Sequence, residues 1–463
     1  MKEMIRICSP HSGHSWGATS YNRFILFFFF TFLPEMNNFV MLNMGVTVEN
    51  PSRIKEAEVI VAIPSYNEAD SIAYPTRIAS EGLVEYFPDK KSVIINVDNG
   101  SPDGTKDVFL TTPTLVPKIY ISTPKGVKGK GSNLRNLFEA VVELHAEAAV
   151  VIDADLKSIT PHWIQYLAEP LFTGFNYVSP IYVRHKYDGS ITNHIAYPLL
   201  RTLYGPRVRQ PIGGDFGFSR SLAQAFLLER TWNESIANFG IDIWMTTVAI
   251  ARRFKVCQTF LGSPKSHRAK DPAAHLGPMF TQVIMTIFDL MVEFEYLWKD
   301  IKESWPSSIF GFGLGVREDP PTVDVDTDAL YSSYISGFDK YEEVWKKIIP
   351  KAELDAVRDT RKIAKGHFYY PSDLWARILF NFAIAYRNKD IAHEFIIESL
   401  IPFYHSRILS FVNKTIDMDI KECEEYFESV VRVFEAEKSY LIKRWDEEKR
   451  NLGHKLFKFE SEE

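Results

Sequence analysis

Two aspartates one residue apart follow a short apolar run in the first half of the chain. The run reads AAVVIDAD from Ala148 to Asp155, so Asp153 and Asp155 stand at its acidic end. Paired carboxylates at a strand end can hold a hard divalent cation such as Mg²⁺ or Mn²⁺. Such a cation could bridge phosphate oxygens and offset the charge that develops on a leaving diphosphate. Asp-x-Asp is also common in solvated loops, so this prediction depends on the elements around it.

Polar residues follow two earlier apolar runs, where they could form a nucleotide pocket. The segment 64–68 reads PSYNE, and the segment 98–105 reads DNGSPDGT. Two solvated turns would have the same composition. The residues that we expect to bind the base and the ribose are Pro64, Tyr66, Glu68 and Asn99.

A basic, glycine-rich loop precedes a predicted helix, and residues 125–131 read KGVKGKG. Glycines let backbone N–H groups approach a phosphate, and a helix N-terminus favours an anion. The loop differs from the GxxxxGK[ST] phosphate loop, so the sequence does not indicate an ATPase.

Apolar runs alternate with amphipathic stretches from Glu58 onward, which predicts strands that alternate with helices. A helix is predicted over Ser71–Tyr86, and Ser132 is expected to cap another. The pattern predicts an α/β fold with a mostly parallel sheet and helices on both faces. Ligands of such sheets bind beyond the carboxyl ends of the strands, so the polar segments should converge on one crevice. The predicted strands are Glu58–Pro64, Ser92–Asp98, Lys118–Ser122 and Ala148–Asp155.

The second half of the chain has helical periodicity and no recognisable chemical motif. Its predicted elements are a helix over 281–302, a loop over 305–322, and helices over 341–349, 374–386, 392–403 and 420–450. We therefore expect an N-terminal extension (1–50), a catalytic domain (51–300) and a helical C-terminal region (301–463). The last region could form a homodimer interface or cover a substrate, and the sequence leaves both open.

The composition excludes several kinds of partner. The 463 residues carry a net charge of -6 and no long basic run, which argues against binding to nucleic acid or to an anionic membrane surface. Cys8, Cys257 and Cys423 lie far apart without a CxxC pair. This spacing indicates a reducing compartment, so we expect a cytoplasmic protein.

The apolar run from Phe24 to Leu33 is too short to span a bilayer. As a helix it would rise about 15 Å, roughly half of a bilayer core. No small-residue cleavage site follows it, so it does not read as a secretory signal. We interpret roughly the first 40 residues as a non-native or mispredicted extension, with a membrane-associating segment as the alternative.

Taken together, the motifs resemble the family 2 glycosyltransferases of the GT-A fold, a Rossmann-like nucleotide-sugar-binding sheet. The nearer resemblance is to the glucosyl-3-phosphoglycerate, glucosylglycerate and mannosylglycerate synthases, and it covers roughly residues 58–290. The helical C-terminal region resembles the mannosylglycerate synthases only loosely. The matching motifs are the Lys-Gly-Lys-Gly loop, Asp153-Ala154-Asp155, Gln210-Pro211-Ile212-Gly213-Gly214-Asp215, Phe239-Gly240-Ile241-Asp242 and Ser266-His267-Arg268.

The resemblance implies roles in binding the donor and the metal. Asp155 and His267 would coordinate Mg²⁺ or Mn²⁺, with Asp153 nearer the donor ribose. Lys130 would meet the donor. The residues that would border the sugar and the acceptor are Gly213, Gly214 and Asp215.

The resemblance also implies a catalytic acid and a stereochemical outcome. Asp242 would hold the acceptor hydroxyl, and it would also serve as the N-cap of a helix from Ile243 to Ala251. The relatives retain anomeric configuration without an obvious nucleophile. This implies front-face attack, in which the leaving diphosphate oxygen helps to take the acceptor proton.

The acceptor-binding segment departs from the enzymes that use a phosphorylated acceptor. Those enzymes carry an arginine two positions before a threonine and an asparagine two positions after the histidine. Here Ser190 precedes Thr192, and Ala269 follows the histidine. Arg184 could pair with an acceptor carboxylate. We therefore expect D-glycerate rather than 3-phosphoglycerate. The side chains left as other phosphate contacts are Lys186 and Arg268.

The sequence thus predicts a retaining, metal-dependent transferase that moves a hexose, with glucose expected, from a nucleotide-diphosphate sugar to D-glycerate. The product would be a hexosylglycerate, a kind of compatible solute. The alternatives within enzymes are a 3-phosphoglycerate acceptor, a GDP-mannose donor, a polymer-type family 2 transferase or a nucleotidyltransferase. The alternative of another class is a non-catalytic nucleotide-sugar-binding protein.

Overall fold

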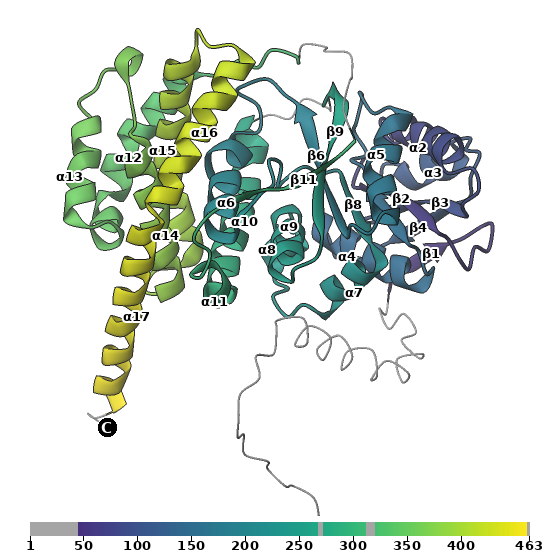
Figure 1. The fold of residues 1–463 in the computed structure, drawn as a ribbon, viewed down its shortest axis with the longest axis horizontal. Coiled ribbons are helices and arrows are strands. Elements are labelled where there is room, and N and C mark those ends of the chain that lie inside the picture. The colour runs from purple at the N-terminus through teal and green to yellow at the C-terminus, as the bar shows by residue number, and fades with distance from the viewer. Residues whose placement is uncertain (1–44, 267–271, 312–319, 461–463) are drawn as a thin grey trace, which may run out of the picture. The chain divides into compact units, whose positions relative to one another are not determined.

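The computed structural model describes residues 45–266, 272–311 and 320–460 of the chain. Within them, nine strands form one sheet in the order β1-β4-β3-β2-β5-β8-β6-β9-β11 (Figure 1). Five of the neighbouring pairs are parallel, and β1·β4, β5·β8 and β8·β6 are antiparallel. The mostly parallel sheet is therefore confirmed. The strands are β1 (Thr47–Glu49), β2 (Val59–Ser65), β3 (Ser92–Asp98), β4 (Lys118–Ser122), β5 (Ala148–Val151), β6 (Tyr177–Val183), β8 (Phe216–Ser219), β9 (Val256–Pro264) and β11 (Ser308–Phe310).

Both faces of the sheet are covered, which explains the uninterrupted apolar runs. All seven residues of β2 are buried, and successive side chains of a strand point to opposite faces. Ile60 and Ala62 belong to one apolar cluster, with residues of α4 (Lys130–Glu143). Val59 and Val61 belong to a second cluster, with residues of α2 (Ala73–Tyr86) and α5 (Pro161–Phe172).

The C-terminal region is helical and shares its core with the sheet-covering helices. One apolar cluster runs from β2 and α4 to Trp375 and Trp445. The predicted domain boundary near residue 300 stays a prediction. The helices are α10 (Pro272–Glu293), α12 (Thr327–Ile348), α13 (Lys351–Thr360), α14 (Ser372–Asn388), α15 (His393–Thr415), α16 (Ile420–Ala436) and α17 (Lys438–Glu460).

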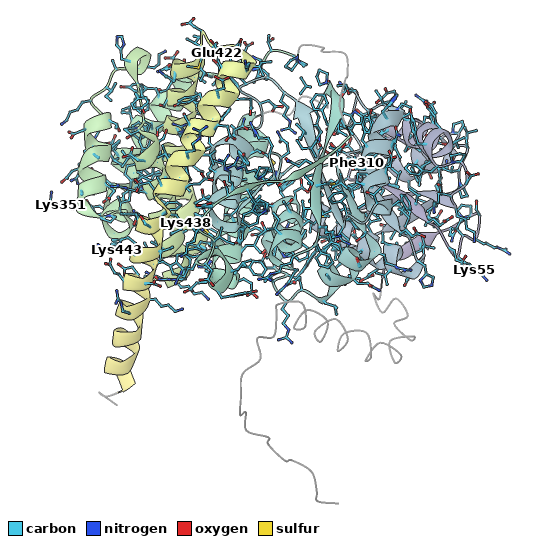
Figure 2. The ribbon with its side chains drawn as sticks, viewed as in Figure 1. Lys55, Phe310, Lys351, Glu422, Lys438 and Lys443 are labelled. Carbon is cyan, nitrogen blue, oxygen red and sulfur yellow. The ribbon has the colours of Figure 1, made fainter. Side chains whose placement is uncertain are left out.

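Two buried cations join this region to α6 (Tyr197–Tyr204), which belongs to the other part of the chain. The Arg201 side chain is 2% exposed and forms ion pairs with Glu428 (2.7 Å) and Glu435 (2.8 Å). Lys438 lies at the start of α17 (Figure 2), and its Nζ donates to the carbonyl oxygens of Thr202 at 2.7 Å and of Ile301 at 2.8 Å. A cation beside the last carbonyls of α6 stabilises that helix end.

Some predicted element boundaries are wrong for local reasons. Helix α4 begins at Lys130 after Gly129, whose φ is +110°, so Ser132 is inside the helix rather than its cap. The Ser132 hydroxyl instead donates to the carbonyl of Lys128 at 3.1 Å. Strand β5 ends at Val151, so the acidic pair lies in the following loop.

The region predicted as one loop over 305–322 contains two short strands. Strand β10 (Trp305–Pro306) pairs with β7 (Pro206–Arg207), and β11 adds to the edge of the main sheet beside β9. The predicted helix over 420–450 is two helices, α16 and α17, that meet at Glu437. The short strands β10 and β11 form because they pair with distant strands, and not because their sequences have strand-like periodicity.

Helix α15 is, among the described residues, the one helix that is long and apolar enough to cross a membrane. However, 72% of its apolar window is buried inside the protein. A core helix has the same properties, so length and composition are weak evidence for a span. The apolar run Phe24–Leu33 lies outside the described residues.

We expect His405 to make the protein lose stability in acid. Burial lowers its pKa to about 4, and its Nδ1 lies 2.7 Å from the Ser333 hydroxyl. The unfolded chain binds this proton near pH 6.5 and the folded chain does not, so the free energy of unfolding falls by about 3 kcal/mol between these pH values. Denaturant titrations from pH 7 to 4 should show a shallower loss for His405→Asn. The exposed His367→Asn is the control, and an unchanged slope in His405→Asn would contradict the assignment.

Candidate active site

The N-terminus of α4 positions Lys130 at the edge of the sheet. Gly131 permits this, because a Cβ there would lie 1.9 Å from the carbonyl oxygen of Ile236. Asn99, which directly follows β3, accepts a hydrogen bond from the Gly129 N–H at 2.9 Å and so fixes the loop from a neighbouring strand end. The backbone of the basic loop is therefore held by the Asn99 side chain on one side and by the backbone of residues 236–238 on the other.

The Lys130 ammonium lies among acidic groups from three distant segments. Its Nζ is 3.1 Å from Asp153 Oδ1, 3.3 Å from Asp242 Oδ1 and 3.5 Å from the carbonyl oxygen of Gly214. Burial alone would lower the pKa of Lys130, but the charges of Asp153, Asp242 and Asp215 outweigh it and raise the pKa. Lys130 is therefore a permanent cation at this site.

A second lysine, Lys265, follows β9 and bridges the other side of the acidic cluster. Its Nζ is 2.7 Å from Asp215 Oδ2, 3.0 Å from Asp153 Oδ2 and 2.8 Å from the carbonyl oxygen of Gly213. The Lys265 side chain is 4% exposed and that of Asp215 is fully buried. Burial opposes the charge on Lys265, yet the two aspartates raise its pKa, so the ion pair persists at neutral pH.

Asp215 is the fixed centre of this cluster. Its Oδ1 accepts the backbone N–H of Asp153 at 3.0 Å, and its Oδ2 accepts the hydroxyl of Tyr182. Gly214 allows the close approach, since its φ is +85° and a Cβ there would lie 2.3 Å from Asp153 Oδ2. Asp215 therefore sets the loop that carries the acidic pair.

Asp242 lies in the first turn of α9 (Ile241–Ala251), which begins two residues earlier than predicted. The prediction that it is the N-cap is wrong, because Gly240 takes that position. Burial raises the pKa of Asp242, and the Lys130 charge opposes this. Its Oδ1 is within ion-pair distance of Lys130 but accepts no aligned hydrogen bond from the described residues. One acidic oxygen is thus free to receive a proton donor.

Asp155 has surroundings unlike those of its neighbour Asp153. It is 8% exposed, and within 45–266, 272–311 and 320–460 no hydrogen bond or ion pair reaches its carboxylate. A buried carboxylate without a partner is costly, and a hard cation is the partner that it fits. The described residues contain no group of three or more potential metal ligands, and His267, the predicted second ligand, lies outside them.

The cluster carries an excess of negative charge that suits a divalent cation. Two ammonium groups, from Lys130 and Lys265, face a larger set of carboxylates. The excess amounts to two negative charges in the described part of the site. The four carboxylates are those of Asp153, Asp155, Asp215 and Asp242.

The residues predicted to bind the nucleotide lie at the ends of β2 and β3. Pro64 is paired in register with Val97 of the neighbouring strand. Tyr66 is 40% exposed, with Lys128 Nζ 4.8 Å from its ring centre, so the ring is a candidate surface for a base. The Glu68 carboxylate accepts the Ser71 hydroxyl at 2.6 Å. Asn99 is buried and, as described above, positions the basic loop.

Two of the predicted acceptor residues, Arg184 and Thr192, lie on the segment that follows β6, whereas Gly213, Gly214 and Asp215 directly precede β8. The Arg184 guanidinium stacks 4.6 Å above the Tyr182 ring, which links it to Asp215 and Lys265. Thr192 is buried at the start of a π-helical turn, η2 (Thr192–Ala196). The Ser190 hydroxyl lies 2.6 Å from the hydroxyl of Tyr404 on α15, so the helical region contacts this segment.

The sequence interpretation missed Lys265 and Tyr182. Lys265 stands directly after β9 and two positions before His267, and lysines at strand ends are common. Tyr182 lies within β6 and reads as a core aromatic. The available signal for Lys265 was a cation that directly follows a strand, but β9 was not among the predicted strands, and no signal marked Tyr182.

Comparisons with known proteins show what the chain is similar to. Residues 60–232 match the model of the family described as Glycosyl transferase family 2. The chain is 26% identical over 264 residues to glucosyl-3-phosphoglycerate synthase of Mycolicibacterium paratuberculosis, covering 52% of this chain and 75% of that protein. It is also 26% identical over 264 residues to glucosyl-3-phosphoglycerate synthase of Mycobacterium tuberculosis, covering 52% and 76%.

Solved structures of the M. tuberculosis enzyme are similar to half of this chain. The complex with Mg²⁺ and UDP matches with 26% identity and a TM-score of 0.40, covering 50% of this chain and 79% of that one. The complex with Mn²⁺, UDP and glucosyl-3-phosphoglycerate matches with 26% identity and a TM-score of 0.40, covering 50% and 80%. Residues 60–232, which contain much of the mostly parallel sheet, are therefore similar to the family 2 glycosyltransferases.

Proposed function

We propose that the protein transfers a hexose, glucose by preference, from a nucleotide-diphosphate sugar to D-glycerate, with retention at the anomeric carbon. The observation that carries this proposal is the cluster in which Lys130 joins Asp153 to Asp242. The Lys130 ammonium, which we assign to the donor, lies 3.3 Å from Asp242, which we assign as the catalytic acid, and this proximity supports the proposal. The relatives named glucosyl-3-phosphoglycerate synthases support glucose and a glycerate-type acceptor.

The two lysines would hold and polarise the donor diphosphate. Lys265 is buried and Lys130 is 17% exposed, and both are fixed by aspartates, so they can stabilise charge on a leaving group without reorganising. The exposed Tyr66 ring and the Glu68 carboxylate would take the base and the ribose. Fixed charges aimed at the leaving group suit a reaction in which the protein mainly orients and stabilises.

A divalent cation, Mg²⁺ or Mn²⁺, would be held by Asp155 and His267. When bound, it would neutralise the diphosphate of the donor. The buried Asp155 carboxylate, which has no partner in the described part of the chain, supports this assignment. Asp153 would face the ribose side, since both of its oxygens already contact lysines.

The acceptor would lie between Asp242 and the segment after β6. Asp242 would accept a hydrogen bond from the attacking hydroxyl through the oxygen that lacks an aligned donor. Arg184 would pair with the glycerate carboxylate; its Nε has no aligned hydrogen-bond partner among the described residues and lies 3.7 Å from Asp188 Oδ2, which the acceptor would replace. Gly213 and Gly214 would border the sugar.

The hydrogen bonds that Lys186 already makes favour an unphosphorylated acceptor. Lys186 Nζ donates to the carbonyl oxygens of Thr415 (2.6 Å), Ile416 (3.0 Å) and Met418 (2.7 Å). Three acceptors saturate an ammonium group, so Lys186 is not available to a phosphate. Ser190 is likewise held by Tyr404.

A coupled assay tests the proposal. The protein, with Mg²⁺ or Mn²⁺, is given UDP-glucose, GDP-glucose or GDP-mannose together with D-glycerate or 3-phosphoglycerate, and released nucleoside diphosphate is followed. We expect release with glycerate and its loss with a chelator. Release only with 3-phosphoglycerate would overturn the acceptor assignment. Donor binding without release across all combinations would favour a binding protein, and release of pyrophosphate a nucleotidyltransferase.

We also propose a cytoplasmic location. Cys257 and Cys423 are free, buried thiols, as expected for a reducing compartment. Whether the protein forms a homodimer through the helical region is a separate expectation, which size-exclusion chromatography with light scattering would test.

A further inference from the structure

We propose that Arg407 anchors an anion site, for a phosphate or carboxylate group, within the helical C-terminal region. The site lies where α15 meets the N-terminus of α14 and the turn η2. The inference rests on contacts of these residues and does not depend on the proposed function.

Arg407 is a fully buried cation with almost no partner. Its side chain is 0% exposed, and its one hydrogen bond is a long contact, 3.4 Å, from Nη1 to the Ser372 hydroxyl. Nε and Nη2 have no hydrogen-bond partner, and no acidic side chain forms an ion pair with Arg407 among the described residues. A buried, unpaired guanidinium is unfavourable unless something negative accompanies it.

The unpartnered atoms form the edge that arginine uses to bind carboxylates and phosphates. Nε and Nη2 point the same way and donate two parallel hydrogen bonds. Two other arginines of the described structure have this edge filled. Arg377 uses it on Glu437, at 2.8 and 3.2 Å, and Arg209 uses it on Glu424, at 3.1 and 2.7 Å. Arg407 presents this edge empty.

Further unpartnered polar groups gather one helical turn along α15. The Phe411 ring lies 5.0 Å from the His194 ring and 6.0 Å from those of Tyr187 and Tyr426. Nδ1 of His194 and the hydroxyls of both tyrosines are buried without a hydrogen-bond partner in the described part of the chain. The three rings that carry these polar atoms therefore pack around Phe411, four residues along α15 from Arg407.

The local field also favours a negative ligand. Ser372 is the first residue of the 17-residue helix α14, and its N-cap, Pro371, has no side chain that could cap it. The free N–H groups of this turn carry partial positive charge. Burial, and then the charges of Arg407 and Arg209, hold the pKa of His194 well below its usual value. A neutral histidine can still donate from Nδ1.

The chemistry of the ligand follows from the donors. Every unpartnered group can donate a hydrogen bond, and two of the donors are parallel, so the ligand needs several acceptor oxygens and a negative charge. Free phosphate and the phosphate group of a phosphorylated acid share this chemistry. Because His194 belongs to η2, which begins at the predicted acceptor residue Thr192, a bound anion would tie that segment to the helical region.

Thermal unfolding of the full chain, in phosphate-free buffer and with inorganic phosphate, tests the site. With phosphate at about 100 times its Kd, we expect the Tm of the unmodified protein to rise by about 3 °C. Arg407→Met should weaken phosphate binding at least about tenfold, since it removes the bidentate edge. Without phosphate, Arg407→Met should be as stable as the parent protein or more stable, because an unpaired buried charge is gone. If Arg407 only stabilised the fold, Arg407→Met would instead be less stable than the parent protein without phosphate.

Three controls make the result specific. Arg361→Met removes an exposed arginine and should keep the full phosphate response. Lys265→Met disrupts the proposed donor site, so a phosphate response that survives in it does not come from that site. Tyr426→Phe keeps the fold, removes one unpartnered hydroxyl, and should reduce the response even if Arg407→Met fails to fold.

Crystals soaked in selenate locate the anion directly. An anomalous peak at the Nε–Nη2 edge of Arg407 would support the proposal, and peaks only at Lys130 or Lys265 would overturn it. Equal phosphate responses of Arg407→Met and the parent would also overturn it. If 3-phosphoglycerate gives the Arg407-dependent rise and inorganic phosphate does not, the occupant is a phosphorylated acid.

Discussion

Lys265→Met is expected to destabilise the protein by about 3–5 kcal/mol, the largest effect of any single change in the active site. The ammonium group is 2.7 Å from Asp215 and 3.0 Å from Asp153, and Asp215 is fully buried. Without Lys265 the Asp215 carboxylate keeps the Tyr182 hydroxyl and one backbone N–H but loses its one ion-pair partner among the described residues. Chemical denaturation monitored by circular dichroism would measure the loss.

A double variant separates charge from packing in this prediction. Lys265→Met combined with Asp215→Asn removes both charges of the buried pair, so it should recover more than half of the stability that Lys265→Met loses. Lys91→Met, which breaks an exposed pair with Glu56, is the control and should change stability by less than about 1 kcal/mol. If Lys265→Met costs no more than this control, the ion pair does not organise the site.

Asp242→Asn is expected to lower turnover by about 10²–10⁴-fold while the Kd of the donor changes little. The asparagine fills the same space in the first turn of α9 but is a poor acceptor for the acceptor hydroxyl. Lys130 keeps Asp153 as its partner, so the donor side of the site stays charged and ordered. Steady-state kinetics with glycerate, together with calorimetry of the nucleotide sugar, would measure both quantities.

Lys130→Met should lower both donor affinity and turnover, and it serves as the comparison for Asp242→Asn. It removes a cation from the donor side, so donor affinity and turnover should fall together. Equal losses of turnover and donor binding in Asp242→Asn would contradict the role assigned to Asp242. Loss of the native circular dichroism spectrum would show that Asp242 is needed for the start of α9 instead.

The sheet was largely predictable because its strands are buried on both faces. The runs Ser92–Asp98 and Lys118–Ser122 match β3 and β4 residue for residue. Where burial depends on distant pairing, prediction failed. Strand β11 exists because Ser308 to Phe310 pair with Cys257 to Thr259, and nothing in three residues reveals this. The predicted helix start at Ser132 was wrong for a similar reason, since the glycine loop is held by contacts with Asn99 and residues 236–238.

The sequence by itself determined the order of the strands along the chain and the acidic and glycine motifs that follow them. Periodicity records which side chains face a core, and a strand end is marked locally. Only the tertiary structure decided which of these residues meet. Lys265 is 112 residues from Asp153, and Lys186 is more than 200 residues from the carbonyls that occupy it. A charged side chain that could pair with several others has no local sequence signal that identifies its partner. The packing of the helices decides which partner it meets.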